Sequence, residues 1–595
     1  MELKARGELD PAYQWDFTHI FPDDAAWEAA MAHAAAGVET VRALRGTLGR
    51  STESLKAGLD AVYQAAERLE TCCIYAMLHK SADGGDAAYQ EMNARAEDLS
   101  NAFSSAAAFL SPELLAIDPA TLDAWMALPA LGTYRHMVED VCRARAHTLD
   151  AATEELLANL GRASAAPSDA FNMFQAVDLT YPPVVDEHGQ EVPLTNGSFG
   201  VFRVSPDRRV RREAFEKYFG AFEQFRNTLA ALYAGSVKFD NFSARTRHYA
   251  GACEASLFQS NVPVSVYDSL VAAVHDGLPA MKRYLALRQQ RLGLSELHLY
   301  DLYCPIVEDV AYPMPFADTK ELVKKALAPL GEAYGKLLDR AYAERWMDVY
   351  ENKGKDSGAF SCGVYGVHPY VLLNYTDTLE DAFTVAHELG HAMHSHFSEE
   401  SNDYVNAGYA LLVAEVASTV NEVLLSKYLL ATETDPRRRA YVLNRFLEGF
   451  RTTLYRQTLF AEFERTAHEM DAAGKPLTAA SLSRVYHELN ALYYDGAVID
   501  PCTDIEWARI PHFYRAFYVY QYATGFSSAV AIASRILETG DAGDYLRFLT
   551  TGGSDYPLEE LKLAGVDLTK PDAVRNALSV FADCVAELEA LTASL

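Results

Sequence analysis

The stretch DAFTVAHELGHAMHSHF, from Asp381 to Phe397, holds four histidines and a glutamate within ten residues. Most of the side chains between them are apolar and recur three or four positions apart, which is the pattern of a buried helix. Thr378, followed three residues later by Asp381, resembles a capping box with an acidic residue in place of the usual Glu or Gln. The stretch therefore predicts an apolar helix that carries imidazole and carboxylate groups.

His387, Glu388 and His391 form the pattern HExxH. Residues four apart lie on one face of a helix, about one turn from each other, so both imidazoles face the same point. Two histidine nitrogens at that spacing suit a zinc ion, which takes nitrogen ligands at about 2.0–2.1 Å. Glu388 lies one position round the helix, beside that point, where a carboxylate suits the role of general base toward water. We therefore expect a zinc site.

A chance match is the alternative, since HExxH arises by composition in about a few per cent of chains of this length. The apolar helix in the same register favours the metal site. His394 is not expected to be a ligand, because a third ligand on one straight helix closes a tetrahedron poorly. Gly390 costs helix stability, about 1 kcal/mol relative to Ala, but its lack of a side chain would let another backbone approach closely.

Glu415 is the strongest candidate for a third metal ligand. It lies in the segment GYALLVAEVASTVNEVLLSKYLL, which predicts an apolar helix from about Tyr409 to Leu430. A charge in the middle of such a helix needs a partner or a metal. An antiparallel return through residues 398–408 would bring Glu415 beside the histidines. Glu422 shares its helix face and could either orient a ligating histidine or form an internal ion pair.

Composition limits the function classes. The chain has 595 residues, 50% of them hydrophobic, and a net charge of −30, which favours a folded protein that repels nucleic acid and anionic lipid. The densest basic run, RVSPDRRVRREAF at 203–215, is interpreted as a charged loop and helix start. No apolar run is long enough for a membrane helix, and the N-terminus lacks a signal-peptide core. The eight cysteines are scattered, as expected of reduced thiols in a cytoplasmic protein.

Helical periodicity dominates the chain, so we predict a mainly α fold. Residues 1–200 are expected to form an N-terminal helical region and residues 201–595 the catalytic region, without a flexible linker between them. Residues 177–204 combine β-branched side chains with turn signals and predict a small hairpin or a three-strand element. A second β-like stretch, from Gly358 to Thr378, leads directly into the histidine helix.

Several separated segments together resemble the oligoendopeptidase F family, within the thimet-oligopeptidase superfamily of zinc peptidases. The likeness is strong from about residue 200 onward and looser before it. It is carried by HPYVLLNYTDTLEDAFTVAHELGHAMHSHFS (368–398), AEVAST (414–419), SLFQSNVPVSVYDSLV (256–271), NKGKDSGAFSCGVYG (352–366) and EWARIPHFYRAFYVYQYATG (506–525).

The resemblance implies a large helical metallopeptidase with a deep substrate cleft or cavity between two helical parts and a small β element lining the active site. It implies cleavage of internal bonds in short oligopeptides by a metal-activated water. One zinc ion per chain would be bound by His387, His391 and Glu415, and Glu388 would be the catalytic base.

The aromatic segment IPHFYRAFYVYQYATGF, from Ile510 to Phe526, would supply donors for the oxyanion of a peptidase reaction. The resemblance assigns catalytic roles to His512, Tyr518 and Tyr522. The two tyrosines are four residues apart, so in a helix both hydroxyls would face one cleft. A further family tyrosine corresponds to Gly525 here, and that role is dropped. Taken alone, the segment is typical of an aromatic core.

The stretch before the histidine helix is expected to bind the substrate backbone, because a strand edge offers unpaired N–H and C=O groups to an extended peptide. The alternative for each residue there is a purely structural role. The predicted substrate-binding residues, including one from the aromatic segment, are Gly358, Ala359, Phe360, His368, Tyr370 and Tyr514.

Two other functions compete with the oligopeptidase. A non-catalytic peptide-binding or chaperone-like protein with a structural metal would not need Glu388, and four protein ligands would close around its zinc. A different zinc amidohydrolase, such as a carboxypeptidase, would release single C-terminal residues. The sequence leaves the cleavage-site preference and the oligomeric state open.

Overall fold

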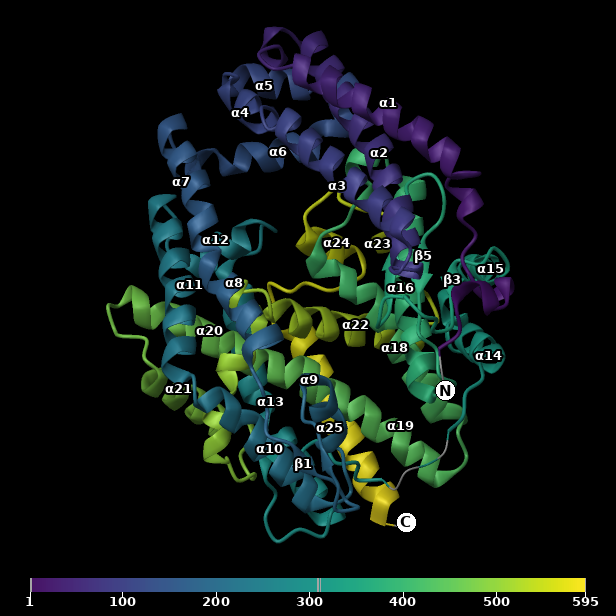
Figure 1. The fold of residues 1–595 in the computed structure, drawn as a ribbon, viewed down its shortest axis with the longest axis vertical. Coiled ribbons are helices and arrows are strands. Elements are labelled where there is room, and N and C mark those ends of the chain that lie inside the picture. The colour runs from purple at the N-terminus through teal and green to yellow at the C-terminus, as the bar shows by residue number, and fades with distance from the viewer. Residues whose placement is uncertain (1–2, 308–309, 311, 594–595) are drawn as a thin grey trace. The chain divides into compact units, whose positions relative to one another are not determined.

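The computed structural model describes residues 3–307, 310 and 312–593, and most of these residues are helical (Figure 1). The predicted mainly α fold is confirmed. Packing divides the chain into two compact units that alternate along the sequence. The first comprises the described parts of Met1–Ala146, Tyr312–Tyr428 and Ile532–Val566, and the second the described parts of His147–Ala311, Leu429–Ala531 and Asp567–Leu595. The predicted division into an N-terminal helical region, residues 1–200, and a catalytic region, residues 201–595, stays a prediction.

The first unit contains two groups of helices, one from the N-terminal part of the chain and one from its middle, with two short helices added later. Helix α18 (Leu411–Thr432) begins in this unit and ends in the second. The helices that lie wholly within it are α1 (Asp24–Ala43), α2 (Thr52–Ala82), α3 (Ala87–Ala107), α4 (Leu110–Ala116), α5 (Pro119–Met126), α6 (Arg135–Arg143), α14 (Phe316–Ala326), α15 (Glu332–Ala343), α16 (Leu379–Ser401), α17 (Tyr404–Ala407), α23 (Gly543–Leu549) and α24 (Pro557–Leu563).

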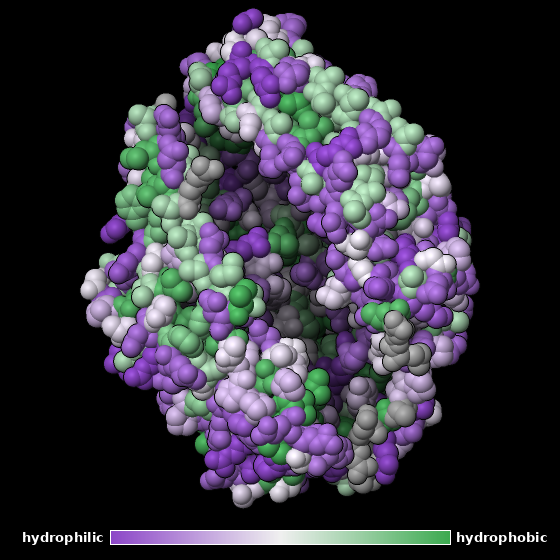
Figure 2. Space-filling model, in the orientation of Figure 1, coloured by the Kyte–Doolittle hydropathy of each residue, from purple (hydrophilic) through white to green (hydrophobic). Residues whose placement is uncertain are grey.

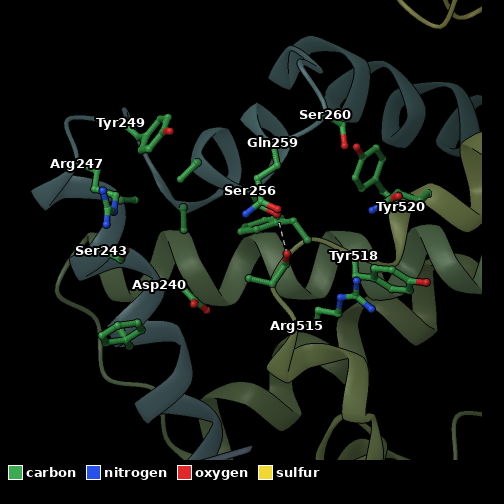
Figure 3. Close-up of a pocket in the computed structure, with 17 residues that line it drawn as sticks. Asp240, Ser243, Arg247, Tyr249, Ser256, Gln259, Ser260, Arg515, Tyr518 and Tyr520 are labelled. Atoms are coloured by element: carbon green, nitrogen blue, oxygen red, sulfur yellow. Dashed lines mark hydrogen bonds between the residues drawn. The ribbon is translucent and has the colours of Figure 1, made fainter. Parts of the chain in front are cut away.

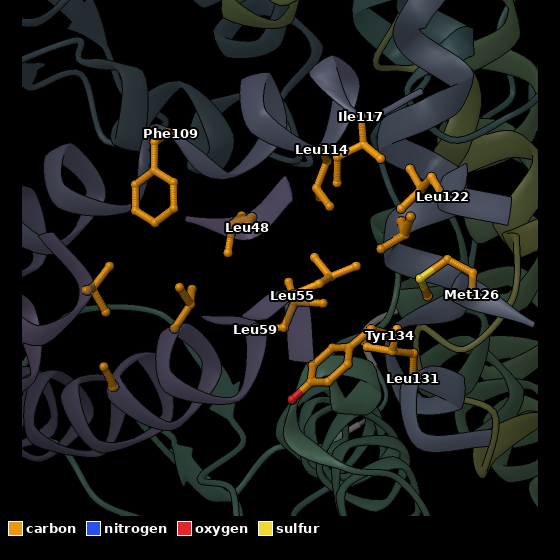
Figure 4. Close-up of a cluster of buried hydrophobic side chains, with 14 of the residues drawn as sticks. Leu48, Leu55, Leu59, Phe109, Leu114, Ile117, Leu122, Met126, Leu131 and Tyr134 are labelled. Carbon is orange, nitrogen blue, oxygen red and sulfur yellow. The ribbon is translucent and has the colours of Figure 1, made fainter. Parts of the chain in front are cut away.

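The N-terminal helices pack around an apolar cluster that runs from α1 to α6 (Figure 4). Leu48, Leu55, Leu59 and Leu114 have no exposed surface in this cluster. Burying a leucine side chain contributes about 1.5–3 kcal/mol relative to leaving it in water. This part of the unit is therefore held together by its own core.

A small three-stranded sheet precedes the histidine helix. Strands β3 (Met347–Asp348), β4 (Phe360–Cys362) and β5 (Tyr370–Leu372) are arranged in the order β3-β5-β4. Strand β5 pairs parallel with β3 and antiparallel with β4, with Phe360 opposite Leu372. The second predicted β element is thus present, and β4 is one of its edges.

The second unit contains the remaining helices and receives the first part of α22 (Tyr520–Thr539). The helices that lie wholly within it are α7 (Ala151–Ser164), α8 (Ala166–Met173), α9 (Asn196–Phe202), α10 (Arg208–Glu223), α11 (Arg226–Thr246), α12 (Ala252–Phe258), α13 (Val264–Arg291), α19 (Pro436–Gly449), α20 (Arg456–Ala472), α21 (Ala479–Tyr493) and α25 (Asp572–Ala593).

The predicted β element at 177–204 is a hairpin, and the three-strand alternative is wrong. Strands β1 (Val184–Val185) and β2 (Glu191–Val192) pair antiparallel. The residues that follow form helix α9 instead of a third strand. The Thr195 side chain accepts a hydrogen bond from the backbone N–H of Ser198, which caps that helix. A local cap therefore outweighed the β-like composition.

The basic run at 203–215 forms a loop and the start of α10, as expected. Arg208 and Arg211 both pair with the buried Asp301 at 2.8 Å, so part of this charge points inward. All eight cysteines are unpaired. Hydrophilic residues are spread over the visible face among smaller hydrophobic groups (Figure 2). Among the described helices, none combines the length and hydropathy of a membrane span.

Candidate metal centre and catalytic residues

The histidine helix begins where the sequence predicts. The Thr378 hydroxyl accepts a hydrogen bond from the backbone N–H of Asp381, and the Asp381 carboxylate accepts hydrogen bonds from the N–H groups of Thr376 and Thr378. This capping box starts α16, whose interior is apolar and buried. The cap residue Thr378 lies nine residues before His387, and the helix begins directly after it.

Helices α16 and α18 approach each other closely at Gly390. A Cβ atom at this position would lie 2.5 Å from the Ser418 Cα and 2.7 Å from the Ala417 carbonyl oxygen. Asn421 Nδ2 donates a hydrogen bond to the Ala386 carbonyl oxygen at 2.9 Å, which ties the two helices together within the buried contact. The predicted close approach of another backbone at Gly390 is confirmed.

This contact brings His387, His391 and Glu415 together. The two histidine Nε2 atoms lie 3.2 Å apart, and Glu415 Oε2 lies 3.5 and 3.6 Å from them. One ligand atom from each residue lies within 4.8 Å of the others. Two imidazole lone pairs and a carboxylate oxygen that face one point need a proton or a cation between them, and this donor set fits a zinc ion.

Glu422 holds the outer nitrogen of His387. Its Oε1 lies 2.7 Å from His387 Nδ1, so this N–H donates to the carboxylate and leaves Nε2 facing the ligand group. The contact suits both roles considered for Glu422, orientation of a ligating histidine and an internal ion pair, and the choice between them stays a prediction. Burial lowers the pKa of His387, but the hydrogen bond and charge of Glu422 outweigh it and raise the pKa to about 9.

The neighbouring groups are shifted in other directions. Burial and the charge of His387 lower the pKa of His391 to about 3. Glu388 is 6% exposed, and burial together with the charges of Glu415 and Glu422 raises its pKa to about 7, against the opposing effect of His387. A carboxylate with a pKa near neutrality is matched to taking up and giving back a proton.

His394 and His396 lie outside this ligand group. His394 is buried, and its ring stacks on Tyr409 at a centroid distance of 3.7 Å. The ring of His396 lies 5.7 Å from that of Trp346. Their contacts are those of packed aromatic side chains, in line with the expectation that His394 is not a ligand.

His512, Tyr518 and Tyr522 lie together in the second unit. The Tyr522 hydroxyl is 3.4 Å from His512 Nε2, and the His512 and Tyr518 rings stack at 5.6 Å. The expectation that both tyrosines belong to one helix is wrong, because α22 begins at Tyr520. Phe517 has a φ of 56°, a left-handed conformation that breaks the helical path just before Tyr518.

The sequence did not identify Glu464, which holds this turn. Glu464 lies in α20 with no exposed surface, and its Oε1 accepts a hydrogen bond from the Phe517 backbone N–H at 2.8 Å. Burial raises the pKa of Glu464 well above its usual range. No clear signal for Glu464 was available in the sequence, because α20 carries several other charged residues and a further carboxylate does not stand out among them.

The predicted substrate-binding residues have different environments. Gly358 and Ala359 line a cavity of about 240 Å³ together with Thr384 of α16. Phe360 begins the edge strand β4 and is half-buried. A ligand bound to the first unit could therefore reach Gly358, Ala359 and Phe360.

The other predicted substrate-binding residues make contacts with the protein itself. His368 stacks on Trp346 at 5.0 Å, and Tyr370 has no exposed surface and donates its hydroxyl hydrogen to the Asp16 carbonyl oxygen. Tyr514, in the second unit, stacks on Phe171 at 4.6 Å. These contacts support structural roles, and substrate binding by these three residues stays a prediction.

The chain is similar in sequence to known peptidases. The sequence model described as Peptidase family M3 matches residues 201–580, and the one described as Oligopeptidase F matches residues 113–181. Together with the helical fold and the two-histidine, one-glutamate group, these matches define a helical metallopeptidase.

Individual relatives span the whole chain. Oligopeptidase PepF of Bacillus subtilis is 40% identical, over 99% of this chain and 89% of its own length. Group B oligopeptidase PepB of Streptococcus agalactiae is 38% identical, over 99% and 98%. The chain belongs to the oligopeptidase F group of peptidase family M3, as its sequence motifs predict.

Solved structures show the same fold. Oligoendopeptidase-F from Enterococcus faecium superposes with a TM-score of 0.75 at 36% identity, covering 96% of this chain and 100% of that one. A chain from Chlamydophila abortus superposes with a TM-score of 0.94 at 32% identity, covering 99% and 100%.

Proposed function

We propose that this metallopeptidase is a zinc-dependent endopeptidase that hydrolyses internal bonds of short oligopeptides, with Glu388 as its general base. The observation that carries the proposal is the convergence of the Nε2 atoms of His387 and His391 with a Glu415 oxygen. Among the described residues, no fourth histidine, cysteine or carboxylate joins this group. Three protein ligands are typical of catalytic zinc sites, which keep a position open, whereas structural sites are closed by four.

Zinc bound to these ligands would polarise the peptide carbonyl and lower the pKa of a water molecule. Glu422 would keep the hydrogen of His387 on Nδ1, so that Nε2 has its lone pair available. Glu388 would take a proton from the attacking water and deliver it to the nitrogen of the leaving amine. Its buried position beside His387 supports this role.

We propose that His512, Tyr518 and Tyr522 donate hydrogen bonds to the negative charge that develops on the carbonyl oxygen. Their mutual contacts support a common role for the three residues. The edge position of β4 supports binding of the substrate backbone along Gly358, Ala359 and Phe360. The names of the relatives support oligopeptides as substrates. Cytoplasmic location remains an expectation from the sequence.

The test is Glu388→Gln measured on a quenched oligopeptide. This substitution removes the proton acceptor and keeps the side-chain shape, so kcat should fall at least about 10²-fold with zinc still bound. Zinc content, measured on the same samples, separates loss of the base from loss of the metal. Glu400→Gln is the matched control, because Glu400 is an exposed residue of the same helix. A wild-type rate for zinc-loaded Glu388→Gln would refute the proposed base.

Mass spectrometry of products from a mixed-length peptide library tests the reaction type. Internal cleavage that stops with a chelator and returns with zinc is the expected result. Release of single C-terminal residues would instead indicate a carboxypeptidase.

A further inference from the structure

The second unit contains a cavity of about 550 Å³ (Figure 3). Its lining comes from α11, from the segment around α12, and from residues 515–521. Cavities that bind small ligands usually measure about 300–1,000 Å³, so this one is large enough for part of a peptide. Tyr518 belongs both to this lining and to the cluster with His512 and Tyr522.

Three charged residues line the cavity, two arginines and one aspartate, although the whole chain has a net charge of −30. Arg247 is already engaged, since its guanidinium donates to both oxygens of Glu154 at 2.8 Å. Asp240 lies 3.1 Å from His468 Nε2. Of these three residues, Arg515 is the one for which no polar side-chain partner appears among the described residues.

Arg515 has the surroundings of a binding group. Its guanidinium carbon lies 4.3 Å from the centre of the Tyr518 ring, and Figure 3 shows the two side chains together at one end of the cavity. The residue is exposed, and within the described ranges no ion pair joins it to an acidic side chain. Its five N–H groups can thus donate hydrogen bonds to a ligand without first breaking an internal salt bridge.

The backbone next to Arg515 is held at two points. The Ser256 hydroxyl donates a hydrogen bond to the Ala516 carbonyl oxygen at 2.8 Å, drawn as a dashed line in Figure 3. Glu464 accepts a hydrogen bond from the backbone N–H of Phe517. A fixed backbone reduces the entropy lost when the arginine binds a ligand.

We propose that this cavity binds a carboxylate group of the peptide substrate through Arg515. The proposal rests on the proposed function, because it makes Tyr518 the residue shared by the carboxylate site and the proposed oxyanion donors. A guanidinium presents two parallel N–H donors to a carboxylate, which gives both charge and geometric recognition. Such a local cation also offsets the repulsion between an acidic ligand and an acidic protein.

Either the C-terminal carboxylate or an acidic side chain of the peptide could supply this group. The experiment measures equilibrium binding of four labelled hexapeptides to the full zinc-loaded chain carrying Glu388→Gln, by fluorescence anisotropy. One peptide is neutral with a free C-terminus, and the second is its C-terminal amide. The third and fourth are amides that carry one Glu or one Gln near the C-terminus. At least one carboxylate peptide should bind about tenfold more tightly than its matched amide.

Arg515→Gln in the same background should abolish that preference, and Arg515→Lys should restore part of it because the charge returns without the paired donors. Arg212→Gln is the matched control, since Arg212 is an exposed residue of α10 that pairs with Glu216. A preference for the free C-terminus or for Glu identifies the source of the carboxylate. No preference, or one that survives Arg515→Gln, overturns the proposal.

Failure of the proposed function gives a different result. Mass spectrometry after each titration shows whether the peptides are intact. Cleavage by Glu388→Gln would refute the general base, and the four peptides would then be compared by KM, again with and without Arg515. Thermal unfolding of the Arg515 variants verifies that they are folded.

Discussion

His387 Nδ1 lies 2.7 Å from Glu422 Oε1, while Nε2 of the same ring faces His391 and Glu415. The carboxylate thus fixes how the ring is turned and, when the ring is neutral, which nitrogen carries the hydrogen. Glu422→Gln weakens this constraint and removes a negative charge, so the zinc dissociation constant should rise about 10–100-fold. Competition with a chelating dye measures it, with Glu400→Gln as the control. An unchanged affinity would mean that the contact has no part in metal binding.

The contact between α16 and α18 at Gly390 predicts a strong effect of one methyl group. A Cβ there would meet the Ser418 Cα at 2.5 Å, and backbone atoms cannot rotate away. Gly390→Ala should separate the helices, lower the unfolding free energy by about 1–3 kcal/mol, and weaken zinc binding through displacement of Glu415. Thermal unfolding with and without zinc measures both effects.

Gly335→Ala is the control, because Gly335 lies in α15 with no atom within 4 Å of the added Cβ. In a helix interior this change should stabilise the protein by up to about 1 kcal/mol. If the two substitutions have similar effects, the close approach at Gly390 does not limit the site.

Metal binding should depend on pH through His387. The raised pKa of about 9 means that this imidazole is protonated at neutral pH without metal, whereas a ligand must be neutral. Zinc binding at pH 8 should therefore release about one proton from His387. Affinity should rise with pH up to about 9 and then level off. Calorimetry in buffers with different ionisation enthalpies counts the protons. Glu388 contributes few of them at pH 8, because this pH lies above its pKa of about 7.

The Glu422→Gln variant is the decisive comparison for this proton count. Loss of the carboxylate should lower the pKa of His387, so fewer protons should be released at pH 8. Equal release by both proteins would show that another group titrates.

The group of His387, His391 and Glu415 could be predicted from the sequence because its parts are set by local rules. Helical spacing places His387 and His391 on one face, and Gly390 indicates a close approach of another backbone. Glu415 followed from the cost of a charge within an apolar helix. Glu422 could not be assigned in the same way, because its role depends on how α18 is rotated against α16.

The aromatic segment was less predictable because its conformation is set from outside. The spacing of Tyr518 and Tyr522 suggested one helix, but the left-handed Phe517 starts α22 only at Tyr520. In this conformation the Phe517 N–H donates a hydrogen bond to Glu464, which lies far away in the sequence. Helix α9 is the opposite case, because its conformation is set locally. The cap at Thr195 starts the helix, although the neighbouring β-branched residues suggested a strand.

Glu464 and Phe517 yield the last prediction. Burial keeps Glu464 protonated by raising its pKa, so Glu464→Gln preserves a neutral side chain with an oxygen acceptor and should keep activity within about threefold. Glu464→Leu leaves the Phe517 N–H unpaired, which costs about 1–3 kcal/mol and frees the turn that carries Tyr518. Its kcat should fall more than its KM rises. Leu459→Ala, in the same helix, controls for stability loss alone. Equal kcat losses in Glu464→Leu and Leu459→Ala, at matched stability, would contradict a positioning role.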